Sequence, residues 1–209
     1  MKRWLAAGLV SFGLFVALGF AVAPRPLGID MSVAGAFEGL WRGTLGRATT
    51  IVSDVLGLVV PAVLMVGVLL GAALAWYRHA RREAGIALRV LVVYLPARAV
   101  SALGKPLFVR NRPRTYAEFS YPSGHVVSVA SAGLALVLLC AWLAPRLARW
   151  VALGAGVATV LVALTRLLLG VHWLTDTVGA VLGVLGVGLV FASVLRLLPR
   201  SVSAPAPTA

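Results

Sequence analysis

A histidine and an aspartate near the end of the chain have the spacing of a catalytic pair. His172 and Asp176 are four residues apart, so they share one face if the segment is helical. In that arrangement Asp176 accepts the Nδ1–H of His172, which fixes the imidazole tautomer and leaves Nε2 free as a nucleophile or base. Asp176 is the only acid in the last 91 residues. An acid beside apolar runs is more often functional than structural; a structural pair that closes a polar gap is the alternative.

A short turn before another apolar run offers a site for an anion. Pro122, Ser123 and Gly124 precede His125 there. Serine is a favourable helix cap, and glycine lets a ligand approach the backbone closely. Free N–H groups at a helix N-terminus attract anions, and His125 in the first turn would face the same point. A capped helix start with a histidine is also common in proteins of many functions.

Three basic residues are the third candidate group. Lys105 and Arg112 are seven residues apart and share a helix face if the helix continues, but Pro113 predicts that the helix ends near Arg112. Arg166 ends a later apolar run, where a charge costs about 2.5–3.5 kcal/mol at a helix centre and needs an anionic partner. Converging Lys and Arg side chains suit a phosphate. Snorkelling at a membrane edge is the alternative.

The composition indicates which elements hold these residues. Of the 209 residues, 61% are hydrophobic and 12% are charged, whereas globular domains have about 25% charged residues. So much apolar surface requires lipid as the solvent. The net charge is +13, and the basic residues lie at the ends of apolar runs, so we expect membrane lipids rather than nucleic acid as partners. The single cysteine, Cys140, excludes an intramolecular disulfide.

Six apolar runs are long enough to span a bilayer at about 1.5 Å per residue. They cover residues 4–23, 54–77, 84–107, 126–143, 150–168 and 176–198. The first run also resembles a signal peptide, but its length and the proline after the apparent cleavage site favour a retained helix. Residues 32–53 have apolar side chains at helical spacing, which is typical of an interfacial helix. We predict an all-α integral membrane six-helix transmembrane bundle, with this interfacial helix after the first span. Residues 1–200 would form one domain and 201–209 a disordered tail.

The distribution of charge predicts the orientation. The N-terminus, the turns at 78–82 and 146–149 and the C-terminal end fall on one side and hold nine Lys or Arg, which indicates the cytoplasm. The candidate residues then lie on the extracytoplasmic side. Lys105, Arg110, Arg112 and Arg114 are concentrated there, against the usual rule, which favours a function such as phosphate binding. We expect Arg110 and Arg114 themselves to lie in a solvated loop.

The three segments resemble the signature motifs of the type 2 phosphatidic acid phosphatase superfamily. This superfamily includes membrane lipid phosphatases and, on a related fold, vanadium haloperoxidases. The matching motifs are Lys105-x6-Arg112-Pro113, Pro122-Ser123-Gly124-His125 and Arg166-x5-His172-x3-Asp176. They cover residues 105–176, and the six-span layout extends the resemblance over most of the chain. Thr165 stands where the superfamily usually has serine, but it keeps the hydroxyl group.

The resemblance implies a metal-independent phosphatase that needs no cofactor. His172 would attack phosphorus and form a phosphohistidine, while Asp176 would orient it. His125 would protonate the leaving oxygen and then activate water. The donors for the phosphoryl oxygens would be Lys105, Arg112, Ser123, Gly124 and Arg166. We expect no metal site, because two-metal catalysis needs several clustered carboxylates or histidines that this region does not offer.

The expected substrate is a lipid phosphate or diphosphate, because the site lies at helix ends beside the headgroup layer. Undecaprenyl diphosphate or another polyprenyl diphosphate, phosphatidic acid, phosphatidylglycerol phosphate and diacylglycerol diphosphate are all compatible, and the sequence leaves this choice open. The compact form resembles bacterial members, so we expect a bacterial cell membrane. An anion transporter, with Arg98 and Arg166 along its path, and a catalytically silent scaffold are the alternatives. A haloperoxidase is a more remote one.

Overall fold

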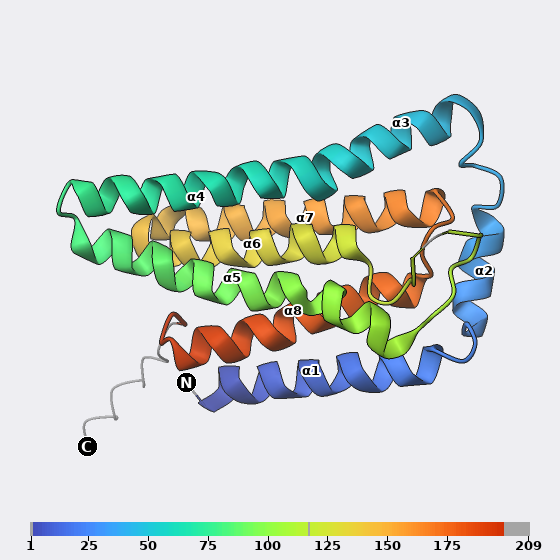
Figure 1. Cartoon of the computed structure of the whole chain (residues 1–209), viewed down its shortest axis with the longest axis horizontal. Helices are drawn as coiled ribbons and strands as arrows, with labels where there is room; N and C mark the ends of the chain where they lie inside the picture. Colours follow the sequence, from blue (N-terminus) through green and yellow to red (C-terminus); the bar gives the residue numbers. More distant parts are fainter. Residues whose placement is uncertain (1, 117, 199–209) are drawn as a thin grey trace, which may run out of the picture.

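The computed structural model describes residues 2–116 and 118–198, and these residues form helices joined by turns and loops (Figure 1). In chain order the helices are α1 (Lys2–Val22), α2 (Gly28–Ala36), α3 (Gly43–Asp54), η1 (Val55–Val59), α4 (Val60–Tyr77), α5 (Arg81–Phe108), α6 (Gly124–Leu143), α7 (Pro145–Leu168) and α8 (Leu174–Val194). The element η1 is a π-helical turn that joins α3 to α4. Such turns are often found at functional sites.

Six helical stretches within the described residues are long and apolar enough to cross a membrane. They are α1, the continuous stretch Gly43–Tyr77, α5, α6, α7 and α8. Large apolar side chains such as Leu70, Leu103 and Val160 are exposed on the outside of the bundle, as is usual for surfaces that contact lipid. The prediction of an all-α membrane bundle with six spans is confirmed.

The first and last spans, α1 and α8, pack against each other along their length (Figure 1). Small residues allow this approach, because a Cβ on Gly186 of α8 would lie 2.7 Å from the backbone nitrogen of Phe12 in α1. Phe15 of α1 stacks on Tyr121, with ring centroids 5.5 Å apart. The Tyr121 hydroxyl also donates a hydrogen bond to the backbone carbonyl oxygen of Phe15, with 2.6 Å between the two oxygens. This contact joins α1 to the loop between α5 and α6.

The three sequence motifs lie at one end of the bundle (Figure 1). This end contains the last turns of α1, α5 and α7 and the first turns of α3, α6 and α8, and α2 crosses it. The short turns between α4 and α5 and between α6 and α7, which are rich in arginine, lie at the opposite end. The bundle therefore presents the candidate residues on one surface, away from the basic turns.

The segment expected as one interfacial helix is divided in the structure. α2 ends at Ala36 and lies across the end of the bundle, whereas α3 begins at Gly43 and continues into α4 as one stretch of 35 residues. Gly39 and Gly43 between them have φ values of 79° and 76°, which glycine adopts at little cost. Asp54, predicted as the start of the second span, lies within this stretch. The predicted tail at 201–209 falls outside the described residues.

Candidate active site

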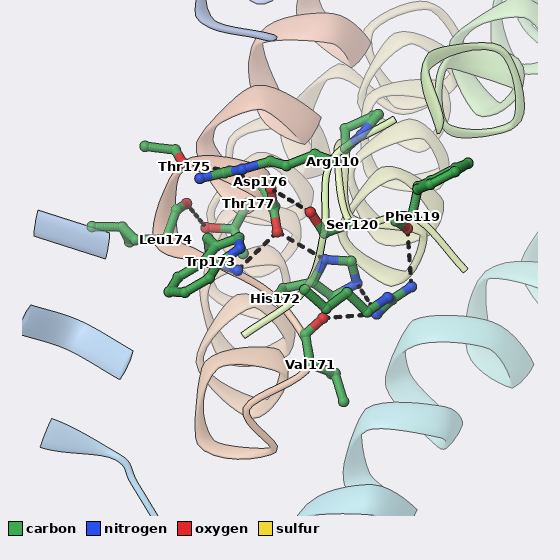
Figure 2. Close-up of polar contacts among 12 residues, drawn as sticks. Arg110, Phe119, Ser120, Val171, His172, Trp173, Leu174, Thr175, Asp176 and Thr177 are labelled. Atoms are coloured by element: carbon green, nitrogen blue, oxygen red, sulfur yellow. Dashed lines mark hydrogen bonds and ion pairs between the residues drawn. The ribbon is translucent and has the colours of Figure 1, made fainter. Parts of the chain in front are cut away.

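His172 and Asp176 meet at the start of α8, as their spacing predicts (Figure 2). His172 lies in the turn between α7 and α8 and is 3% exposed. Its Nδ1 is 3.2 Å from Asp176 Oδ2, and the same oxygen accepts the Trp173 N–H at 2.8 Å. Asp176 is the third residue of α8, where a carboxylate commonly turns back to bond the backbone before the helix. The helix start thus holds the carboxylate against the imidazole.

The contact at the second ring nitrogen of His172, Nε2, identifies which nitrogen carries the proton. Arg112 Nη1 lies 3.1 Å from His172 Nε2. A guanidinium group can only donate, so Nε2 accepts, and the ring proton resides on Nδ1 and points at Asp176. Burial, helped by the charges of Arg112 and Arg166 and opposed by Asp176, lowers the pKa of His172 to about 4. The imidazole is therefore neutral at physiological pH.

Arg112 is fixed between two loops by carbonyl acceptors. Its Nε donates to the Glu118 carbonyl oxygen at 2.6 Å, and its Nη2 donates to that of Phe119 at 3.2 Å. Its Nη1 also donates to the Val171 carbonyl oxygen at 2.7 Å. These bonds hold the guanidinium of the α5–α6 loop beside the residue that precedes His172. Arg112 is thus positioned without a helix, because α5 ends at Phe108 and Val109 adopts a left-handed φ of 48°.

Lys105 lies in the last turn of α5 and forms an ion pair with Glu118. The Glu118 side chain is 63% exposed, and it also approaches Arg112 at 4.0 Å. The hydrogen bond from Lys105 and the charge of Lys105 lower the pKa of Glu118, despite some desolvation. One exposed, ionised carboxylate thus lies between the two basic residues of the first motif. Their proximity depends on the loop rather than on a shared helix face.

The second motif forms the start of α6. Ser123 is its N-cap and is fully buried, and its hydroxyl has no hydrogen-bond partner within residues 2–116 and 118–198. Gly124 is the first helical residue, and a Cβ there would lie 3.2 Å from the Ser101 hydroxyl oxygen. This helix start therefore places an unpaired buried hydroxyl beside backbone N–H groups, which are groups that can bind an anion.

His125 in the first turn of α6 contacts the stretch formed by α3 and η1. Its Nε2 is 3.1 Å from Oδ1 of Asp54, the last residue of α3. Gly57 of η1 lies against the imidazole, since a Cβ at that position would be 2.6 Å from His125 Cδ2. Glycine is thus needed at this point for the close approach. The structure contains a second histidine–carboxylate pair that the motif spacing does not indicate.

Arg166 near the end of α7 is 6% exposed. Its Nη1 donates to the Ser53 hydroxyl at 3.1 Å, and its Nε has no partner among the described residues. Among the described residues, no carboxylate is hydrogen-bonded to Arg166. The structure therefore does not show the anionic partner that the sequence predicts for this residue. Ser53 and Asp54 are adjacent, so the end of α3 contacts both Arg166 and His125.

Arg110 is not in a solvated loop, and that expectation is wrong. It is 1% exposed, with Nη1 2.5 Å from Asp176 Oδ1 and Nη2 2.7 Å from Asp30 Oδ2. Two buried carboxylates compensate its charge, which makes burial possible. Arg114 is half-buried, and its guanidinium lies 5.5 Å from the ring centroid of Trp41.

Asp30, Asp54 and Arg110 are charged residues of this end to which the sequence alone assigns no role in the site. The chain has only six acidic residues, so each acid beside an apolar run was a usable signal. Asp54 begins the apolar run at 54–77 and is such an acid. The partners of these residues are far along the chain, 71 residues away for Asp54 and 80 for Asp30, so the sequence does not indicate what they contact.

The chain is similar to known proteins over most of its length. Residues 86–198, more than half of the chain, match the family model of the PAP2 superfamily. The structure resembles the crystal structure of the first transmembrane PAP2 type phosphatidylglycerolphosphate phosphatase from Bacillus subtilis, with a TM-score of 0.72 and 25% sequence identity. The match covers 93% of this chain and 98% of that chain. No curated protein sequence matches significantly. The chain belongs to the PAP2 superfamily and has the fold of a membrane phosphatase.

Proposed function

We propose that this protein is a metal-independent lipid phosphatase that transfers a phosphoryl group first to His172 and then to water. The observation that carries the proposal is the placement of the His172 imidazole between the Asp176 carboxylate and the Arg112 guanidinium. Its Nδ1–H faces Asp176 at 3.2 Å, while its Nε2 lone pair faces Arg112 Nη1 at 3.1 Å. A neutral imidazole held in this way is a nucleophile that needs no prior deprotonation.

In the first step His172 Nε2 forms a bond to phosphorus and the bond from phosphorus to the lipid oxygen breaks. The imidazole becomes positively charged as the P–N bond forms, and the Nδ1–H···Asp176 contact stabilises that charge. Arg112 Nη1, now 3.1 Å from Nε2, would then donate to an oxygen of the transferred group. Because the guanidinium is already fixed by carbonyl oxygens, it needs little reorganisation during the reaction.

Unpaired donors around His172 support binding of a phosphoryl group. The Ser123 hydroxyl and the Nε of Arg166 are buried, and neither has a hydrogen-bond partner in the described part of the chain. Buried polar atoms are normally satisfied, so a ligand with several acceptor oxygens is a natural partner for these two. Lys105 would exchange Glu118 for the phosphate. Arg112, Arg166 and Lys105 would together supply the positive charge that a metal ion provides in other phosphatases.

His125 is the proposed acid and base. It gives a proton to the lipid oxygen as the P–O bond breaks, so the leaving group departs as an alcohol or as a lipid phosphate. In the second step His125 takes a proton from water, the water oxygen bonds to phosphorus, and the P–N bond breaks. The electron pair returns to His172 Nε2, and inorganic phosphate is released.

The position of the site favours a lipid at the extracytoplasmic face. The candidate residues lie at the end of the bundle opposite the basic turns, whose positive charge favours the cytoplasmic side for the end that holds those turns. A headgroup at the membrane surface can reach them while its chains stay in the bilayer. The similar Bacillus subtilis enzyme is a phosphatidylglycerolphosphate phosphatase, so phosphatidylglycerol phosphate is tested beside phosphatidic acid and polyprenyl diphosphates.

The decisive experiment measures phosphate release by the detergent-purified protein from this panel of lipids in excess EDTA. We expect turnover by the wild type and none by His172→Ala. Acid quenching with labelled substrate should trap a phosphoenzyme in the wild type alone. His79, in the turn between α4 and α5, provides the control: His79→Asn, which suits its positive φ, should retain full turnover.

Each outcome has a distinct meaning. Turnover by His172→Ala would exclude His172 as the nucleophile. Activity that EDTA abolishes and a divalent cation restores would overturn metal independence. If no lipid is hydrolysed by the wild type, the phosphatase proposal fails, and anion transport into vesicles becomes the next test.

A further inference from the structure

A buried set of charged residues lies behind the proposed nucleophile, on the side away from the phosphate donors. Arg110 Nη1 is 2.5 Å from Asp176 Oδ1, and Nη2 is 2.7 Å from Asp30 Oδ2. Figure 2 shows Arg110 reaching from the loop after α5 to the start of α8. Asp30 and Asp176 are both 0% exposed. Three charges, from α2, the α5–α6 loop and α8, are therefore removed from water together.

Asp30 is held as firmly as Asp176. Its carboxylate accepts the Thr175 N–H at 2.9 Å, the Thr175 hydroxyl at 2.8 Å and the Leu27 N–H at 3.2 Å. Despite burial, these hydrogen bonds and the one from Arg110 lower the pKa of Asp30, so it is ionised at neutral pH. Asp30 and Asp176 are both the third residue of their helices and both accept a backbone N–H from the residue before the helix.

The summed charge of Asp30, Arg110 and Asp176 gives Asp30 a role beyond packing. Arg110 orients Asp176, but its positive charge also cancels the negative charge that His172 needs when it becomes cationic. With Asp30 included, the three groups sum to one negative charge. The other charged groups near His172 are Arg112 and Glu118 of the α5–α6 loop and Arg166 of α7.

We infer that Asp30 is a positioning residue for the proposed phosphatase reaction: it balances Arg110, so that Arg110 can hold Asp176 without cancelling the charge that stabilises phosphorylated His172. The inference rests on the proposed function. Asp30 lies outside the residues that match the family model. It contacts none of the proposed phosphate donors, so its effect should be on kcat and not on KM.

The test compares Asp30→Asn with the double variant Asp30→Asn/Arg110→Met. Asp30→Asn leaves Arg110 and Asp176 as a neutral pair, and we expect kcat to fall at least about tenfold with KM unchanged, since one pKa unit of charge stabilisation is a factor of ten. The double variant removes both outer charges and restores the single negative charge of Asp176. Its kcat should recover toward the wild-type value.

Two controls separate charge from structure. Glu38→Gln removes an exposed negative charge just after α2 and should leave kcat and KM unchanged. Thr175→Val removes the hydroxyl that contacts both Arg110 and Asp30 but changes no charge, so its loss of kcat should be smaller than that of Asp30→Asn. Thermal unfolding in detergent checks that each variant is folded.

Several results would overturn the inference. They are an unchanged kcat in Asp30→Asn, an equal loss in Thr175→Val, and a folded double variant that is no more active than Asp30→Asn. If Asp30→Asn does not fold, the double variant alone decides the question. A loss of kcat above about a hundredfold in the folded double variant would mean that the contacts of Arg110 with Asp30 and Asp176 are essential, and not the charge balance. Absence of a phosphoenzyme in the wild type would instead refute the proposed function itself.

Discussion

The two histidine–carboxylate pairs of this protein differ in how tightly the carboxylate is held. The Asp176 side chain is 0% exposed, whereas the Asp54 side chain is 52% exposed. Apart from His172, the groups that donate to Asp176 are Trp173 N–H, Arg110 and Ser120. Within the described part of the chain, the Asp54 carboxylate has one hydrogen bond, to His125 Nε2 at 3.1 Å. The pair with the proposed nucleophile is rigid, and the other pair can separate.

This difference fits the two proposed tasks. A nucleophile keeps one tautomer and one orientation through both steps, so a carboxylate held by several donors serves it well. An acid that later acts as a base must exchange partners, first the lipid oxygen and then water. A single hydrogen bond to an exposed carboxylate is weak enough to break when substrate arrives. The comparison predicts a graded series of effects.

The largest loss is expected for Asp176→Asn. This change removes the negative charge behind His172 and offers an amide that can favour the wrong tautomer. An analogous aspartate-to-asparagine change behind the histidine of serine proteases lowers kcat on the order of 10⁴-fold. We expect a comparable loss in the rate of phosphoenzyme formation, measured by rapid acid quench. A loss below tenfold would contradict the role of the rigid pair.

His125→Gln should reduce turnover by about 10²–10⁴-fold, the range for general acid–base catalysis. The loss should depend on the leaving group, because an aryl phosphate departs without a proton. With such a substrate the variant should still form the phosphoenzyme but hydrolyse it slowly, so the intermediate accumulates. Equal losses for alkyl and aryl substrates would argue against His125 as the acid.

A much smaller change is expected for Asp54→Asn. An exposed ion pair contributes about 0.2–1 kcal/mol, so kcat should fall about twofold to fivefold. Side-by-side measurement with Asp176→Asn tests the comparison directly. If the two variants lose equally, both carboxylates are essential, and the exposure of Asp54 has no functional meaning.

Glu118→Gln should have the smallest effect, a decrease in KM of about twofold, because the exposed, ionised carboxylate of Glu118 competes with phosphate for Lys105. The pKa of Glu118 is lowered by Lys105, so wild-type Glu118 remains ionised until the pH falls below the usual range of a glutamate. The KM values of the two proteins should differ at neutral pH and converge only below that range. A KM that rises in the variant would show that Glu118 assists binding.

The sequence predicts the spans and the motifs well, but not the contacts between distant segments. The spans follow from apolar runs, and the contact of His172 with Asp176 is local, within one helical turn. By contrast, Arg110 looks like any loop arginine, because the carboxylates that bury it come from residues 30 and 176. The apolar run at 84–107 predicts the end of α5 to within one residue, but Pro113 wrongly predicts helix as far as Arg112, because Val109 adopts a left-handed φ of 48°, which is rare for a β-branched residue.

The packing of α1 against α8 has a consequence for biogenesis. During synthesis α1 enters the membrane long before α8 has been made. The face of α1 that α8 later covers is therefore in contact with lipid until α8 is inserted. The helix that completes the bundle also carries Asp176. Until α8 is inserted, the imidazole lacks its carboxylate and Arg110 lacks one of its two counterions. A partly inserted chain should therefore be inactive, and the ability to cleave lipid phosphates should arise together with the closed bundle.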